Sequence, residues 1–177
     1  LLSLRSIRAT ISVVLLILMS ILSALGIAGW LGWSLTPTSA IAPTIILTMA
    51  VADCVHLLVT MLHNMRIKHE KKQAIIESLR INFQPVFLTS LTTAIGFLSM
   101  NFSDAPPFRD LGNIVAIGVM IAFFLSIIFL PAIMTILPVR VTLKDDPDNV
   151  FMNRLAEFVI RRRKALLIVN GLLAAVL

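Results

Sequence analysis

Apolar residues are gathered into long runs along this sequence, and shorter polar segments separate them. Four complete runs cover residues 10–33, 40–62, 86–102 and 111–137. A bilayer core about 30 Å thick needs about 20 predominantly apolar residues per helix. The pattern therefore predicts an all-α, polytopic transmembrane helix bundle with four complete spans. A fifth apolar run, residues 165–177, is too short to span and is expected to begin a further helix.

Two of the polar segments also carry a helical pattern. Within residues 63–84, apolar side chains recur every three to four positions, which predicts an amphipathic helix on the membrane surface. Pro85 is expected to end this helix and to open the third span. Residues 139–164 are expected to form a second amphipathic segment. Its apolar face consists of Phe151, Leu155, Phe158 and Val159.

The composition agrees with a membrane protein, and the placement of charge sets its orientation. Apolar residues make up 58% of the chain and charged residues 14%, against about 25% charged in globular proteins. Every Lys and Arg except Arg109 lies before residue 10, in residues 63–84 or in residues 139–164. The positive-inside rule places these basic segments in the cytoplasm. The net charge of +6 thus reflects the basic segments that stay in the cytoplasm, where they would also attract anionic lipid. No motif in the sequence indicates nucleic-acid binding.

One ionisable residue, Asp53, lies just past the middle of the second run. A carboxyl group at the bilayer centre costs a few kcal/mol, so such groups usually face a bundle interior and have a function. A carboxyl group whose charge depends on its neighbours can bind and release a proton, as a proton-coupled protein requires. Asp53 is therefore the candidate proton-relay residue. The alternative is a buried carboxyl that only holds helices together.

Two neighbours on the same helix are further candidates for the relay. His56 follows Asp53 by three residues and Thr60 by seven, so both are expected on its face. A histidine within a helix also packs or donates a hydrogen bond without any relay role. One Asp and one His are too few ligands for a metal site, and the single Cys54 gives no disulfide framework. The sequence therefore predicts no metal and no cofactor, with protons as the coupling ion.

A stripe of small and hydroxyl-bearing residues follows one side of the third span. Such a stripe suits close packing against a partner helix near the relay, because small side chains let backbones approach. Leucine at the glycine of this stripe is expected to disrupt folding or transport, whereas Ser90→Leu, on the other side, is expected to be mild. The stripe consists of Thr89, Thr92, Thr93 and Gly96.

Several motifs resemble the resistance–nodulation–division (RND) superfamily. They are the segment that begins at Asp53, then ESLRINFQPVFLTSLTTAIGFLSM, FSDAPPFRDLG and SIIFLPAIMTILP. Within the superfamily, the chain resembles the hydrophobe- and lipid-exporter branch (MMPL-like). The same unit is similar to the sterol-sensing domain. The resemblance covers nearly the whole chain.

The resemblance implies a fragment of a two-repeat transporter. Residues 1–138 would belong to the first transmembrane repeat as its third to sixth helices. Residues 139–164 would form the cytoplasmic linker, and residues 165–177 the start of the next helix. The second transmembrane repeat and the extracytoplasmic porter domains would lie outside this chain. Asp53 matches the family's proton-relay position, with its main partner in the second repeat. Drug-efflux members carry a second carboxylate where Ala52 stands here.

The function expected from this resemblance is that of a secondary active transporter, not an enzyme. It would export lipidic or hydrophobic substrates across the bacterial cytoplasmic (inner) membrane, driven by protons. Two alternatives are a sterol- or lipid-sensing membrane module without transport, and a protein-translocation accessory. The superfamily includes several oligomeric states, so the resemblance sets neither the oligomeric state nor the substrate.

Overall fold

The computed structural model describes residues 7–66, 70–137, 154 and 161–162. The chain divides into two compact units, Leu1–Val141 and Thr142–Leu177. In the second unit, the described residues are three exposed arginines: Arg154, Arg161 and Arg162. The predicted amphipathic linker helix and the start of a further span therefore lie outside the described residues.

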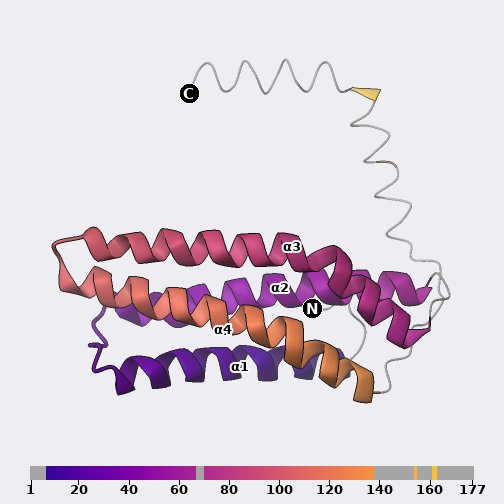
Figure 1. Ribbon diagram of the computed structural model, residues 1–177, viewed down its shortest axis with the longest axis horizontal. Helices are drawn as coiled ribbons and strands as arrows, with labels where there is room; N and C mark the ends of the chain where they lie inside the picture. The colour runs from indigo at the N-terminus through magenta and orange to yellow at the C-terminus, as the bar shows by residue number, and fades with distance from the viewer. Residues whose placement is uncertain (1–6, 67–69, 138–153, 155–160, 163–177) are drawn as a thin grey trace. The chain divides into compact units, whose positions relative to one another are not determined.

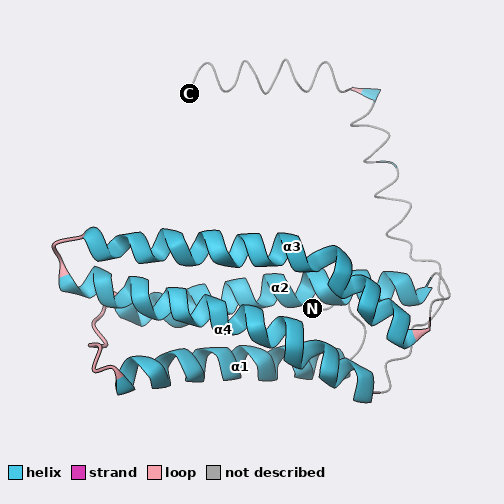
Figure 2. Ribbon diagram, in the orientation of Figure 1, coloured by secondary structure: helices cyan, strands magenta, loops and turns pink. Residues whose placement is uncertain are grey.

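The first unit contains four long helices. They are α1 (Ile7–Trp30), α2 (Ala42–Arg66), α3 (Lys71–Leu98) and α4 (Pro106–Ile136). Short 3-10 turns, η2 (Ser39–Ile41) and η3 (Ser99–Phe102), precede α2 and follow α3. Successive helices run in opposite directions (Figure 1), and the described part of the chain contains helices and loops but no strand (Figure 2). All four helices are long and apolar enough to cross a membrane, which confirms the predicted all-α transmembrane bundle.

Helix α3 corrects one expectation. A surface helix and a separate third span were predicted on either side of Pro85, but the structure has one continuous helix from Lys71 to Leu98. A proline inside a helix removes a single backbone hydrogen bond, here the one to the Ile81 carbonyl, and bends the helix. Val86, directly after the proline, is buried, so packing holds the two halves in one helix. Figure 1 shows the bend in the first half of α3.

Helix α4 packs on all three other helices, and two of its glycines allow the close approach. A Cβ atom at Gly118 would collide with the Ile46 side chain of α2 and lie 3.1 Å from Ala24 Cβ of α1. A Cβ atom at Gly112 would collide with the Phe97 carbonyl oxygen of α3. The packing of the bundle core therefore requires that Gly112 and Gly118 of α4 carry no side chain.

Gly112→Ala is expected to destabilise the bundle by about 1–3 kcal/mol, the usual cost of overpacking. The added methyl group meets a backbone carbonyl, which cannot rotate away as a side chain can. Gly96→Ala is the matched control, because nothing lies within 4 Å of a Cβ atom built there. Thermal melting of the two purified variants measures the difference. Equal melting temperatures would show that the close approach of α4 to α3 is not tight.

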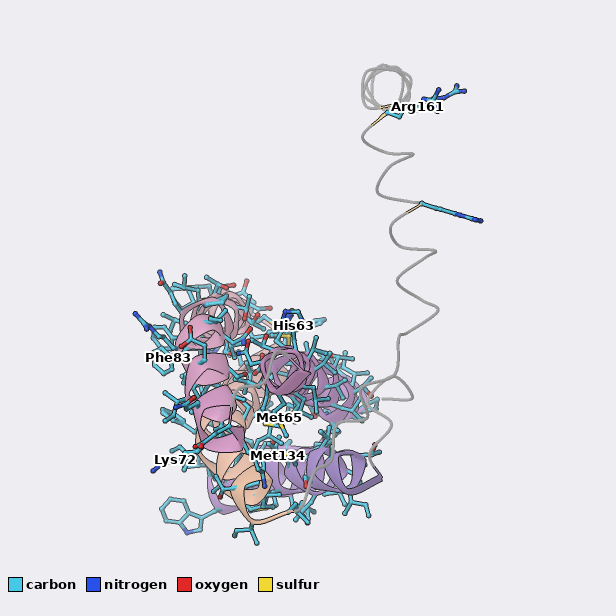
Figure 3. The ribbon with its side chains drawn as sticks, turned by 90° about the vertical axis from the view of Figure 1, so that its right-hand side faces the viewer. His63, Met65, Lys72, Phe83, Met134 and Arg161 are labelled. Atoms are coloured by element: carbon cyan, nitrogen blue, oxygen red, sulfur yellow. The ribbon has the colours of Figure 1, made fainter. Side chains whose placement is uncertain are left out.

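Hydrogen bonds join α4 to the 3-10 turn η3, directly after α3, at one end and to the start of α3 at the other. At one end, Asn101 Nδ2 donates to Asn113 Oδ1 over 2.7 Å, and Asn113 Nδ2 donates back to Asn101 Oδ1 over 3.1 Å. At the other end, Lys71 Nζ donates to the carbonyl oxygens of Thr135 and Leu137, at 2.8 and 2.6 Å. Lys71 thus satisfies carbonyls at the C-terminus of α4, where a cation is also favoured by the helix dipole. Met65 and Met134 pack between the helices near this end (Figure 3).

Candidate functional site

Asp53 lies in the middle of α2 and points into the bundle. It is the twelfth residue of the helix, about 17 Å from the first at 1.5 Å per residue. Only 2% of its surface is exposed. Its neighbours on the same face, Ala50, Cys54 and Leu57, are also buried. An ionisable group is therefore held in the interior of the bundle, at the middle of a helix long enough to cross a bilayer.

The Asp53 carboxyl has one polar partner among the described residues, the hydroxyl of Ser90. Ser90 Oγ on α3 donates to Asp53 Oδ2 over 3.4 Å, and Ser90 is fully buried. No Lys, Arg or His of the described ranges forms an ion pair with Asp53. The carboxyl is thus shielded from water and, within this bundle, is not neutralised by a cation.

Ser90 belongs to a line of small and polar residues that α3 turns toward α2. The line recurs every four residues, and all of its members are buried; they are Ala74, Ser78, Asn82, Val86, Ser90 and Ala94. Ser78 Oγ donates to the Leu57 carbonyl of α2 over 2.6 Å. Two serines of this line therefore bond to α2, one to its backbone and one to Asp53. The four-residue repeat is the sequence signal that would have identified Ser90, and the sequence analysis missed it.

The predicted stripe lies on a different side of α3. Thr89, Thr92 and Gly96 are exposed, and Thr93 is half-buried. The hydroxyls of Thr89 and Thr92 donate to carbonyls of their own helix, at 2.7–3.1 Å. The stripe does not contact Asp53, and its packing against a helix outside the described residues stays a prediction.

The expectation that Ser90→Leu would be mild is wrong, because Ser90 faces the core of the bundle and is 0% exposed. The two sides of α3 were thus assigned in reverse with respect to Asp53. Both sides carry hydroxyl groups at helical spacing, so composition alone does not separate them.

The structure does not bring His56 or Thr60 to the Asp53 carboxyl. His56 is exposed, and Thr60 is half-buried with its Oγ1 donating to the His56 carbonyl over 3.0 Å. Three residues along a helix correspond to a rotation of about 60° from the starting side chain. The buried residues Cys54 and Leu57 lie to one side of Asp53 and His56 lies to the other, so His56 falls outside the buried face of α2. A relay role for these two residues stays a prediction.

Metal-binding chemistry has no support in the part of the chain that the structure describes. No group of three or more His, Cys, Asp or Glu side chains lies close enough together there to hold a metal ion. The chemistry that this site can perform is proton binding at Asp53, with Ser90 as its partner.

The family model of the MMPL family matches residues 1–165, which includes all four helices and both Asp53 and Ser90. Comparison with curated proteins and with solved structures found no match. The family match covers far more than half of the chain. With four spanning helices and a buried carboxylic acid in the middle of the second, the chain belongs to the MMPL family.

Proposed function

We propose that this chain is the proton-binding part of a proton-driven exporter of lipidic or hydrophobic substrates. Members of the MMPL family are membrane transporters and not enzymes, and the four apolar helices make this chain a membrane-embedded module of that kind. The observation that carries the finer proposal is the buried Asp53 with a single hydroxyl partner in the described bundle.

The energetics favour a proton-binding role. An ionised carboxylate in the bilayer interior costs a few kcal/mol or more unless a cation or several donors compensate it. The described bundle offers one donor, Ser90 Oγ at 3.4 Å. Uptake of a proton removes the charge and its cost. Ser90 suits both states, because a hydroxyl donates to an ionised carboxylate and accepts from a protonated one.

Proton binding would be linked to movement at the α2–α3 interface. In the ionised state Asp53 accepts a hydrogen bond from Ser90, and in the protonated state it donates one, so the two states favour different packing of α2 against α3. We propose that Asp53 takes its proton from the extracytoplasmic side and releases it to the cytoplasm. The second transmembrane repeat and the porter domains would act on the substrate. The membrane would be the bacterial cytoplasmic membrane, with the basic segments in the cytoplasm.

The test is transport by the full-length protein in proteoliposomes under an imposed pH gradient. A fluorescent lysophospholipid serves as the substrate probe, and an entrapped pH dye reports protons. We expect lipid movement in one direction with proton movement in the other, and both should stop when a protonophore collapses the gradient. Lipid movement that ignores the gradient would remove the proton-driven proposal. Lipid binding without movement would favour the sensing module.

A further inference from the structure

The first half of α3, before the bend, exposes two cations and two large apolar side chains on one side. Lys72, Ile76, Arg80 and Phe83 follow one another at spacings of four, four and three residues, which places them along one face of a helix. Ile76 is 55% exposed and Phe83 48% exposed. Figure 3 shows Lys72 and Phe83 projecting from the same outward side of α3. We name this surface, defined by these four residues, the α3 basic face.

The two cations of the α3 basic face have no partner in the described part of the chain. The neighbouring Lys71 donates to carbonyls at the end of α4 and is not available to a ligand. Lys72 and Arg80 form no hydrogen bond or ion pair with any described residue. Gln73, Glu77 and Gln84 lie beside them on an adjoining polar flank. The face therefore combines free positive charge with exposed apolar surface, and a polar flank borders it.

The length of α3 places this face at the edge of a bilayer. The helix has 28 residues, which corresponds to about 42 Å, whereas the hydrocarbon core is about 30 Å thick. Its span also has the lowest mean hydropathy of the four, 1.3 against 2.1–2.8. About 20 residues counted back from Leu98 fill the core, which puts Arg80 and Phe83 near its boundary. Lys72 and Ile76 then lie in the headgroup region.

We propose that the α3 basic face binds anionic phospholipid in the leaflet at which α3 begins. Lys72 and Arg80 would contact lipid phosphates, Ile76 would lie among the headgroups, and Phe83 would insert among the acyl chains, as in interfacial amphipathic helices. A lipid fits better than an acidic protein, because the exposed apolar surface continues along the same helix into the membrane at Leu88 and Ile95. This inference does not depend on proton coupling at Asp53.

The test places a bimane fluorophore on the full-length F83C variant, in a background without other reactive cysteines. Brominated lipids quench the fluorophore when they contact it. When each brominated lipid is titrated into the same host bilayer, we expect phosphatidylglycerol to reach half-quenching at about tenfold lower mole fraction than phosphatidylcholine. The preference should fall to near one in K72A/R80A. R109A, which removes an exposed cation from the first turn of α4 instead, should keep it.

Three results would overturn the proposal. Equal quenching by both lipids would show that the face does not select anionic lipid. A preference that survives K72A/R80A would assign the selectivity to other residues. Absence of quenching by either lipid would show that protein covers the face or that water surrounds it. Should K72A/R80A fail to fold, a salt titration of the F83C protein replaces it, because screening by salt must reduce the preference.

Discussion

Asp53→Asn is expected to abolish proton-coupled transport and to leave the bundle folded. Asparagine keeps the size of the side chain and still accepts a hydrogen bond from Ser90 Oγ, which lies 3.4 Å from the carboxyl. It has no proton to exchange. Positioned proton-transfer groups contribute roughly 10²–10⁴-fold to rate, so we expect a loss of at least about 10²-fold in gradient-driven transport. Melting of the purified variant should stay close to that of the unmodified protein, because no buried charge or cavity is created.

The matched control is Asp104→Asn, the same chemical change at an exposed residue of the α3–α4 turn. It should retain transport and stability alike. Transport in proteoliposomes and thermal melting are measured on the same preparations. Transport at the unmodified rate by Asp53→Asn would eliminate the relay and favour the lipid-sensing alternative. Parallel loss of stability and transport would indicate that Asp53 mainly holds helices together.

Ser90→Leu is expected to be the most destabilising single change near Asp53. Leucine is much larger than serine and enters a site with 0% exposure between α3 and α2. Overpacking of this kind costs about 1–3 kcal/mol. The variant also leaves the Asp53 carboxyl without its hydroxyl partner, and an unsatisfied buried polar group costs about 1–3 kcal/mol more. Thermal melting in detergent measures the sum.

Two further variants separate the causes. Thr92→Leu is the matched control for size, because Thr92 is exposed on another side of the same helix and bonds to its own backbone. It should melt near the unmodified protein. Ser90→Ala removes the hydroxyl without adding bulk, so it should fold and lose transport more than stability. If Ser90→Leu melts no lower than Thr92→Leu, then α3 does not pack on Asp53 through Ser90.

The sequence was sufficient to predict the number of spans and the position of Asp53, because both depend on length and hydropathy. A run of apolar residues must span or be buried, and a carboxyl within it must avoid lipid. The ends of the helices were predicted less accurately. The third span begins earlier than predicted, since Pro85 only bends α3, and whether a proline ends a helix depends on the packing of the following turn.

The residues around Asp53 were harder to predict, because their assignment depends on which helix faces which. Thr89 and Ser90 are adjacent in sequence and similar in chemistry, yet one is exposed and the other is fully buried against α2. The rotation of α3 decides between them, and its signal is the four-residue repeat that runs from Ala74 to Ala94, not the chemistry of either residue. His56 illustrates the same limit on α2, where a rotation of about 60° separates an inward from an outward side chain.

The bonds at both ends of α3 and α4 have a mechanical consequence. The side-chain amides of Asn101 and Asn113 hydrogen-bond to each other at one end of the helical hairpin formed by α3 and α4. At the other end, Lys71 donates hydrogen bonds to the carbonyls of Thr135 and Leu137. Sliding of one helix along the other would break at least one of these hydrogen bonds, so the bonds hold α3 and α4 in register. We therefore expect a displacement of α3 at Ser90, where it meets Asp53, to be accompanied by a displacement of α4.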